Sequence, residues 1–453
     1  MRGNDNSSND GGTSMFEAIK KRLAFYSVSI AARCALRRFK PVVVLITGSA
    51  GKSMVKEAIG AILNHSRRYE GAVRKSPEAV PGCLRGYILP LTILKEWTAD
   101  DFAPFCLPHK SIGGRIRRTI VWLRCFIRII EIIAYVPIRY PRVLVFEYGV
   151  DRALVLRNLL PFMRPTVGIV TMLSLPPPHS ELWEGTDGVL REKARIVEAL
   201  ASRGAAILNY DDKTVLSLKE KTRARVVTFG FSEGADMRII EFQNHFEEIN
   251  PGISFKLEHG GNVVPVMMKN VFGKGHCYGA AAAACAGLVF GLHLVEISEA
   301  LGTFTYSGRI GMQRVPGIKK SFLLDSSYHA CPASLAEALL VLKEFGSGRK
   351  VAVIGDMVGL GPETIEAHGK VGRDVAGFCG LLVTVGPRGK FIARAAELGG
   401  MSEHYIVACD TAAEAARELQ QRMQKGDSVL ISGSKEMGLD KVVEEVREEV
   451  ERN

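Results

Sequence analysis

The sequence predicts an α/β protein whose parallel-rich sheets are covered by helices and divided between two main domains. Short apolar runs alternate with segments of helical periodicity along most of the chain, a pattern typical of strand–helix–strand units. The chain has 453 residues, 47% of them hydrophobic, so it is too long for one ordinary domain and can bury a large core. A glycine-containing loop after the first strand indicates a phosphate-binding domain.

The front of the chain, residues 1–40, is expected to form a short arm. Residues 1–14 are rich in Gly, Asn and Ser and predict a disordered tail. Residues 16–38 predict a basic amphipathic helix. Its segment KKRLAFYSVSIAARCALRR resembles a secretion signal, but Arg33 interrupts the apolar part, so we reject a signal peptide.

The first α/β domain is expected over residues 41–308. Its first strand is Val42–Ile46, a continuous β-branched run, and its first helix covers residues 53–63. A basic helical insertion is expected at about 110–138, where four charged residues follow one helical stripe: Arg117, Arg124, Arg128 and Glu131. Further elements are expected in RVLVFEYG, TVGIVTML and GAAILNYDD (strands), in residues 188–201 (helix) and in GAAAAACAGLVFGL (a tightly packed helix).

The second α/β domain is expected over residues 309–453 and is predicted to be Rossmann-like. Its strands are the apolar runs SFLLDSS, KVAVIGDM, LLVTVG and DSVLISGS, with helices between them. Strand–helix alternation of this kind predicts a parallel sheet.

The charge of the chain is unevenly placed. Residues 1–142 hold 24 Lys and Arg against 10 Asp and Glu, a surplus of +14, and the remainder holds 35 against 38, or −3. A uniform nucleic-acid binder would not divide its charge this way, so we expect no nucleic-acid partner. The two basic helices could instead contact an anionic membrane surface, or pack on the sheet or on each other.

The cysteines and the hydropathy indicate a cytoplasmic protein. The nine cysteines include no C-x-x-C pair, which argues against a disulfide framework or a zinc ribbon. No uncharged span of about 20 apolar residues occurs, so no transmembrane helix is expected. We therefore expect a cytoplasmic monomer, with peripheral contact at the inner membrane face as an open alternative.

The stretch TGSAGKS carries the chemistry of a phosphate loop. The backbone N–H groups of Gly48, Ser49, Ala50 and Gly51 can surround phosphate oxygens, and the next helix offers its positive N-terminal end. Lys52 would neutralise the β- and γ-phosphates, and Ser53 would bind Mg²⁺. Ile46 occupies the place of the first glycine in the longer common pattern, so the loop is a shorter form. The alternative is an ordinary glycine turn followed by a chance lysine.

The chain resembles the Mur ligase family and its folylpolyglutamate synthase relatives. TGSAGKS is similar to the family's loop, and HSELWEGTDGVLREKARIVEAL resembles a segment in which a His and a Lys lie fourteen residues apart. LLDSSYHACPASL and VAVIGDMVGLGPETIEAHGKVG resemble the C-terminal domain of the family's MurF branch. The resemblance covers roughly residues 41–450, weakly between 65 and 140, and lacks the branch's usual N-terminal UDP-binding domain.

The resemblance assigns a metal site and catalytic residues. It implies that Ser53 and Glu147 hold one Mg²⁺ and that His179 helps to bind a second. It further implies that Lys193 reacts with CO₂ to give a carbamate that faces the metal, and that Lys52, Lys193 and His179 serve catalysis. The alternatives are a buried Glu147 with a structural partner, a loop histidine at 179 and a solvated helix lysine at 193.

The resemblance also assigns nucleotide contacts. It implies that His276, Arg309 and Asp325 contact ATP, the last at the ribose, although Arg309 could instead form a structural salt bridge. Several positions depart from the family pattern and leave open an altered substrate, a relaxed nucleotide choice or lost activity: Cys277, Ser326, His329, Cys331, Arg195, Ser432 and Lys435.

The function implied by the resemblance is ATP- and Mg²⁺-dependent amide formation through an acyl phosphate. The MurF branch joins D-alanyl-D-alanine to a peptidoglycan-precursor carboxylate, so the expected partners are such a carboxylate and an amino acid or dipeptide. One alternative is a ligase of the same type that adds glutamate or another amino acid to a non-UDP acceptor. The other is a nucleotide-binding scaffold without turnover.

Overall fold

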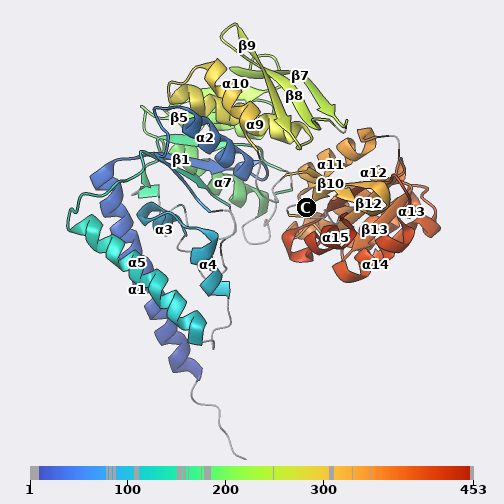
Figure 1. The fold of residues 1–453 in the computed structure, drawn as a ribbon, viewed down its shortest axis with the longest axis horizontal. Helices are drawn as coiled ribbons and strands as arrows, with labels where there is room; N and C mark the ends of the chain where they lie inside the picture. Colours follow the sequence, from blue (N-terminus) through green and yellow to red (C-terminus); the bar gives the residue numbers. More distant parts are fainter. Residues whose placement is uncertain are drawn as a thin grey trace, which may run out of the picture. The chain divides into compact units, whose positions relative to one another are not determined.

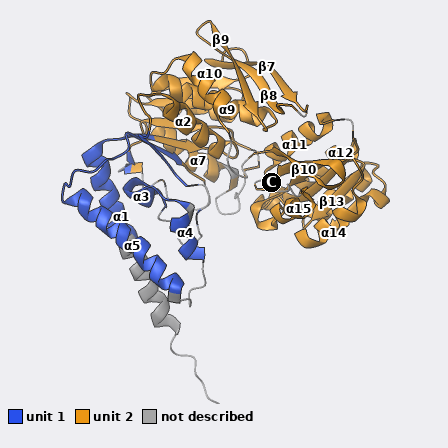
Figure 2. Ribbon diagram, in the orientation of Figure 1, with its two compact units in different colours: residues 1–43, 71–146, 161–163 blue, residues 44–70, 147–160, 164–453 orange. Residues whose placement is uncertain are grey.

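A computed structural model of the protein describes residues 10–77, 80, 84, 88–106, 112–149, 156, 160–161, 163–174, 176–177, 185–247, 249–305, 311–328, 330–346 and 348–448. The chain separates into two compact units (Figure 2). Unit 1 comprises residues 1–43, 71–146 and 161–163, and unit 2 comprises residues 44–70, 147–160 and 164–453. The domain boundaries expected from the sequence, at residues 41, 308 and 453, are not tested by this division and remain a prediction.

Unit 1 holds the basic part of the chain. Its long helices α1 (Asp10–Phe39) and α5 (Ile112–Ile133) contact each other and lie side by side in Figure 1. Its shorter elements are β2 (Val73–Lys75), α3 (Ile88–Leu94), α4 (Ala99–Cys106) and β3 (Val143–Glu147), of which β2 and β3 pair in parallel. None of the helices in the described part of the chain combines the length and apolarity needed to span a bilayer.

Unit 2 contains a sheet in the order β1-β4-β5-β6-β7-β8-β9. Strand β1 (Val42–Thr47) enters this unit from unit 1, and its pairing with β4 begins the parallel part. The parallel strands that follow are β4 (Val167–Val170), β5 (Ala205–Asn209), β6 (Arg225–Gly230) and β7 (Met237–His245). Antiparallel strands β8 (Gly252–His259) and β9 (Asn262–Lys269) complete the order.

Helices accompany this sheet as the strand–helix alternation predicts. They are α2 (Lys52–His65), α7 (Gly185–Glu198), α8 (Lys213–Leu216), the short helix η3 (Ser217–Lys221), α9 (Lys274–Val289) and α10 (Leu294–Thr303). Helix α9 packs closely on α2, because a Cβ atom at Gly279 would lie 2.5 Å from the Cγ atom of Met54. The expected small-residue helix is therefore confirmed as a tightly packed one.

The second sheet of unit 2 has the order β10-β11-β15-β12-β13-β14. Its strands are β10 (Gln313–Gly317), β11 (Ser321–Ser326), β12 (Lys350–Gly355), β13 (Leu381–Val385), β14 (Ile406–Cys409) and β15 (Ser428–Ser432). The pairings between these strands are parallel except that of β10 with β11. The Rossmann-like parallel sheet expected at the C-terminal end is thus observed, with one antiparallel edge strand.

Helices cover both faces of this second sheet. They are α11 (Pro332–Glu344), α12 (Thr364–Ala376), α13 (Gly389–Leu398), α14 (Ala412–Arg422) and α15 (Asp440–Val446), with short 3₁₀ turns η4 (Ile318–Lys320), η5 (Gly361–Glu363), η6 (Glu403–Tyr405) and η7 (Lys435–Met437). Ile354 packs in one apolar core with residues of α11 and α12, whereas its neighbour Val353 packs in another with residues of α14 and α15. Alternating residues of β12 therefore pack into two different apolar cores, one on each face of the sheet, which explains the continuous apolar sequence of this strand.

The motif GDM…H-x-x-V-G stabilises this part of the fold. The Nε2 atom of His368 accepts a hydrogen bond from the backbone N–H of Met357 at 3.0 Å. Asp356 is buried and accepts one from the backbone N–H of Gly389 at 2.8 Å. A Cβ atom at Gly372 would lie 2.2 Å from the carbonyl oxygen of Ile392, so only glycine permits this approach of α12 to α13. These motif residues act through packing and hydrogen bonding.

Three sequence expectations differ from the structure. Helix α1 begins at Asp10 rather than at residue 16, so residues 10–14 are helical and the expected disordered tail is wrong for them. Strands β7, β8 and β9 form an antiparallel meander in a stretch where no strands were expected. Strand β10 is likewise antiparallel to its neighbour. Polar residues alternate along β7 because one face of the meander is exposed, unlike the buried parallel strands.

Candidate functional site

The glycine loop joins the buried strand β1 to the N-terminus of α2. Gly51 has φ +80° at the N-cap of this helix, a left-handed conformation that glycine adopts without a steric penalty. Lys52 bends back over the loop, and its Nζ atom donates to the carbonyl oxygens of Gly48 at 2.9 Å and Ser49 at 3.5 Å. The loop thus has the strand–turn–helix setting that its sequence predicts, with an ammonium group above it.

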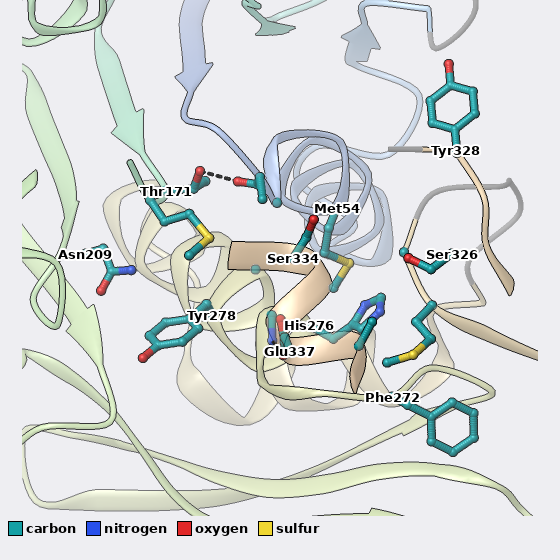
Figure 3. A pocket seen from close by; sticks show the side chains of 18 residues that line it. Met54, Thr171, Asn209, Phe272, His276, Tyr278, Ser326, Tyr328, Ser334 and Glu337 are labelled. Atoms are coloured by element: carbon teal, nitrogen blue, oxygen red, sulfur yellow. Dashed lines mark hydrogen bonds between the residues drawn. The ribbon is translucent and has the colours of Figure 1, made fainter. Parts of the chain in front are cut away.

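Thr171, just after β4, holds the loop from the neighbouring strand. Its Oγ1 atom donates to the carbonyl oxygen of Ala50 at 2.6 Å (Figure 3) and lies 3.3 Å from that of Thr47. A Cβ atom at Gly48 would lie 1.9 Å from the same Oγ1 atom. Gly48 is therefore required by this close approach, and the threonine fixes the path of the loop.

Ser49 connects the loop to Lys193 on α7. The Nζ atom of Lys193 lies 3.0 Å from the Oγ atom of Ser49, and the backbone N–H of Ser174 donates to the same oxygen at 3.0 Å. Only 3% of Lys193 is exposed, so a solvated helix lysine is excluded. Burial, together with the charge of Lys52, lowers the pKa of Lys193 to about 7. A large fraction of Lys193 is therefore an uncharged amine near neutral pH.

Glu147 ends β3 and carries a partly buried carboxylate. Its Oε2 atom lies 3.8 Å from the Nζ atom of Lys56, a residue of α2 that is fully buried. The same ammonium group lies 3.4 Å from the Oε1 atom of Glu57. The structural partner considered for Glu147 therefore exists. About one-fifth of the Glu147 side chain remains exposed, although its Oε2 atom is buried.

A pocket opens beside the glycine loop (Figure 3). Its lining combines loop residues, apolar side chains and a few polar groups: Ala50, Gly51, Met54, Thr171, Met172, Asn209, Phe272, Gly275, His276, Tyr278, Gly279, Gly311, Met312, Ser326, Tyr328, Ser334, Glu337 and Ala338. An apolar hollow with convergent polar groups next to a phosphate loop has the composition expected of a nucleotide site. The lining residues belong to unit 2. They come from segments next to its first sheet, such as Asn209, and from segments next to its second sheet, such as Ser326.

His276, near the start of α9, is part of this lining. The ring is buried, and burial lowers its pKa to about 4, so it is neutral at physiological pH. A Cβ atom at Gly311 would lie 2.5 Å from the Cε1 atom of the ring, and Gly311 has φ +88°. Glycine at 311 therefore satisfies both a left-handed backbone and the approach of the imidazole.

The structure brings some of the sequence-predicted residues together and leaves others undescribed. The loop residues, Lys52 and Lys193 share hydrogen bonds, and His276 lines the adjoining pocket. Asp325 lies at the end of β11, where it accepts a hydrogen bond from the backbone N–H of Ser327 at 3.0 Å, and its neighbour Ser326 lines the pocket. His179, Arg309 and His329 lie outside the described residues.

The sequence reasoning missed several residues of the site. Thr171 carried no signal because its role depends on a contact between neighbouring strands. Glu337 on α11 accepts a hydrogen bond from the backbone N–H of Gly275 at 2.5 Å, and burial raises its pKa. Within the described residues, no group of three or more His, Cys, Asp or Glu side chains is arranged to hold a metal ion. A metal site built from the described residues alone would need Ser53, phosphate oxygens or a modified lysine among its ligands.

Two family models match the chain. Residues 131–287 match the Mur ligase middle domain, and residues 312–435 match the Mur ligase glutamate ligase domain. The chain is 26% identical over 416 residues to the UDP-N-acetylmuramoyl-tripeptide--D-alanyl-D-alanine ligase of Escherichia coli (strain K12), an alignment that covers 90% of this chain and 77% of that relative.

Solved structures show the same fold. A MurF ligase from Thermotoga maritima in complex with ADP superimposes with a TM-score of 0.69 at 19% identity, covering 98% of this chain and 86% of that one. A MurF from Acinetobacter baumannii superimposes with a TM-score of 0.69 at 22% identity, covering 93% and 80% of the two chains. Both comparisons extend over the two sheets described above.

Proposed function

Because the chain belongs to the Mur ligase family, whose members are ATP-dependent ligases that form carbon–nitrogen bonds, we propose that it activates a carboxylate with ATP and joins it to an amine. The observation that carries this proposal is the hydrogen bond between Lys193 and Ser49. It holds a lysine with a lowered pKa against the same glycine loop over which Lys52 bends. A loop used only to bind a nucleotide would not require this second, buried lysine.

The first step is phosphoryl transfer to the substrate carboxylate. A carboxylate oxygen attacks the γ-phosphorus of ATP, the bond to the bridging oxygen breaks, and ADP leaves. The loop N–H groups and the Lys52 ammonium would neutralise charge on the transferring phosphoryl group. An amine nitrogen then attacks the acyl carbon and loses a proton, and phosphate leaves with one oxygen of the original carboxylate.

Ser53 and Glu147 would hold Mg²⁺, which would screen the negative charge that develops during phosphoryl transfer. A hydroxyl and a carboxylate fit this ion, because Mg²⁺ prefers oxygen ligands and keeps several waters. The protonated form of Lys193 cannot bind Mg²⁺, because an ammonium group has no lone pair to donate. The uncharged amine of Lys193 can instead react with CO₂ to form a carbamate, whose oxygens would suit a second cation.

The pocket beside the loop would hold the nucleoside of ATP. Its apolar residues Met54 and Phe272 suit a base, and its polar residues Asn209 and Glu337 suit hydrogen bonding. Support comes from the Thermotoga maritima structure of the same fold, which is described as a complex with ADP. Asp325 would meet the ribose, and His276 would contribute a neutral ring.

The substrates proposed are a peptidoglycan-precursor carboxylate and D-alanyl-D-alanine. The name of the Escherichia coli relative supports them, because that protein aligns with 90% of this chain. The positions that depart from the family pattern motivate two other outcomes, a ligase for a different acceptor and a scaffold without turnover. Of these positions, Ser326 lines the pocket and Cys331 is buried at the start of α11.

One experiment separates these outcomes. The protein is incubated with ATP, Mg²⁺, D-alanyl-D-alanine or other amino acids, and either UDP-N-acetylmuramoyl tripeptide or other carboxylates. Phosphate and amide product are then measured. Amide from the muramoyl tripeptide supports the proposed reaction, product only from another pair supports a sibling ligase, and nucleotide binding without turnover supports the scaffold.

The matched variants are Lys52→Ala and Lys219→Ala. Lys52→Ala should abolish phosphate release, whereas Lys219→Ala, on an exposed lysine of η3, should leave it unchanged. Retained turnover in Lys52→Ala would remove the loop from the mechanism.

A further inference from the structure

Helix α5 turns an apolar surface toward solvent. We define the α5 outer face by its side chains that are between 44% and 59% exposed: Ile116, Ile120, Leu123, Phe126, Ile127, Ile130 and Ile133. At 100° per residue, these positions cover one continuous side of the helix. The face runs from Ile116 to Ile133, so at 1.5 Å per residue it extends for about 26 Å. A continuous apolar surface of this size marks an interaction site rather than scattered surface residues.

The opposite side of α5 is fixed to unit 1. Val121, Cys125 and Ile132 are buried on that side. The Arg38 guanidinium of α1 donates to the carbonyl oxygens of Glu131 at 3.0 Å, Ile132 at 2.8 Å and Val136 at 2.6 Å, and so caps the C-terminus of α5. The outer face is therefore held in place by the fold, and rotation of the helix to hide it would break these contacts.

Arginines border the α5 outer face. Arg117 and Arg124 are exposed along one edge. Arg128 continues this edge, and its Nη1 atom pairs with the Glu131 carboxylate at 2.9 Å, which neutralises the only acidic residue between positions 112 and 142. That segment holds seven Arg and one Glu, a net charge of +6. The face is thus apolar at its centre and positive at its edge.

Helix α1 adds residues of the same kind. Tyr26 and Ile30 are 60% and 58% exposed, one helical turn apart, and Arg33 and Arg37 are exposed on the following turns. Tyr135, directly after α5, is 73% exposed, and the Arg38 guanidinium lies 4.8 Å from its ring centroid. Exposed aromatic, apolar and arginine side chains of this kind suit the boundary between lipid headgroups and acyl chains.

We infer that the α5 outer face docks unit 1 onto the surface of an anionic lipid bilayer. The apolar residues would enter the headgroup boundary, and Arg117 and Arg124 would contact lipid phosphates at the edge. Phosphates of a nucleic acid would leave the apolar centre uncovered. A second copy of the chain would cover the apolar centre but would bring no negative charge to the arginine edge, because residues 112–142 hold one Glu against seven Arg. This inference does not depend on the proposed ligase activity.

The test is flotation of the full chain with vesicles of equimolar phosphatidylglycerol and phosphatidylcholine, compared with vesicles of phosphatidylcholine alone. Wild type is expected to float with the anionic vesicles at low salt and to be released by high salt. Arg117→Gln/Arg124→Gln should weaken binding about 25-fold, since each basic group near the surface contributes about fivefold. Ile120→Glu/Ile127→Glu should abolish it.

Matched controls place the same substitutions elsewhere. Arg203→Gln/Arg223→Gln and Val295→Glu/Leu398→Glu change exposed residues of unit 2 and should bind like wild type. Hydrogen exchange of the wild-type chain gives a second measurement that needs no variant, and residues 116–133 should gain protection when anionic vesicles are added.

Several results would overturn the inference. One is absence of flotation with anionic vesicles at low salt, and another is flotation that survives Ile120→Glu/Ile127→Glu. Self-association of the lipid-free protein that this double variant abolishes, without vesicle binding by wild type, would make the face an interface between copies. Both α5 variants are expected to keep wild-type ligase activity on soluble substrates. The flotation result can therefore be interpreted even if the protein shows no ligase activity.

Discussion

The Nζ atom of Lys193 lies 3.0 Å from the Oγ atom of Ser49, although 144 positions separate the two residues in sequence. The contact ties helix α7 to the glycine loop that follows β1. It places a buried amine within reach of the groups that would surround a triphosphate.

The reactivity of Lys193 should depend on pH. Burial and the nearby Lys52 disfavour its charged form and lower the pKa to about 7, so the amine is mainly protonated below pH 7 and mainly neutral above it. Only the neutral amine attacks CO₂. In NMR spectra with ¹³C-bicarbonate, a carbamate signal should therefore rise through pH 7. The signal should be absent from Lys193→Ala, and a signal that persists in this variant would assign the carbamate elsewhere.

Ser49→Ala should weaken both the fold and catalysis. The substitution removes the oxygen that contacts Lys193 and accepts from the backbone N–H of Ser174, so the free energy of unfolding should fall by about 1–2 kcal/mol. The rate of phosphate release should fall about tenfold because Lys193 loses its anchor.

Ser217→Ala is the control for this change, because Ser217 is exposed and outside the loop. Its free energy of unfolding, measured by urea denaturation, should stay within about 0.5 kcal/mol of wild type. Equal effects of the two substitutions would mean that the Ser49 contacts contribute no more than an ordinary surface hydroxyl.

Lys56→Met should destabilise the protein by about 3 kcal/mol, because removal of a buried ammonium leaves the Glu147 and Glu57 carboxylates without this partner. Urea denaturation of Lys56→Met, Glu147→Gln and the double variant measures the coupling. The double variant should be more stable than Lys56→Met alone. Additive losses would show that Lys56 and Glu147 do not interact energetically.

Gly311→Ala should weaken nucleotide binding more than an alanine at another left-handed glycine does, because it also disturbs the pocket. Its φ of +88° costs a non-glycine residue about 1–2 kcal/mol, and the new Cβ atom would also displace the His276 ring in the pocket. Gly400→Ala is matched, because Gly400 has φ +94° and a Cβ atom there would meet no described atom within 4 Å. Calorimetric titration with ADP should show at least tenfold weaker binding for Gly311→Ala and unchanged binding for Gly400→Ala.

The fold could be predicted from the sequence where the signal is local. A β-branched run before TGSAGKS sufficed for β1 and α2, and continuous apolar runs sufficed for the parallel strands of the second sheet. The meander β7-β8-β9 was missed because its half-exposed strands mix polar with apolar residues. The exposed Pro265 within β9 was an unused signal, since proline in a sheet favours an edge strand.

The site was less predictable because its contacts join distant segments. Thr171 holds the loop through two carbonyl oxygens, and nothing in TVGIVTML distinguishes it from any other threonine after a strand. The buried environment of Lys193 likewise depends on packing of α7 against the loop. Its sequence setting, REKAR, is typical of a solvated helix surface. Only the family resemblance singled it out.

Transfer of oxygen from the acceptor to phosphate tests the central claim most directly. The acceptor carboxylate is labelled with ¹⁸O and incubated with the protein, ATP, Mg²⁺ and the amine, and the released phosphate is analysed by mass spectrometry. Activation as an acyl phosphate predicts one ¹⁸O atom in each phosphate formed together with amide. Amide formation accompanied by unlabelled phosphate would contradict the account.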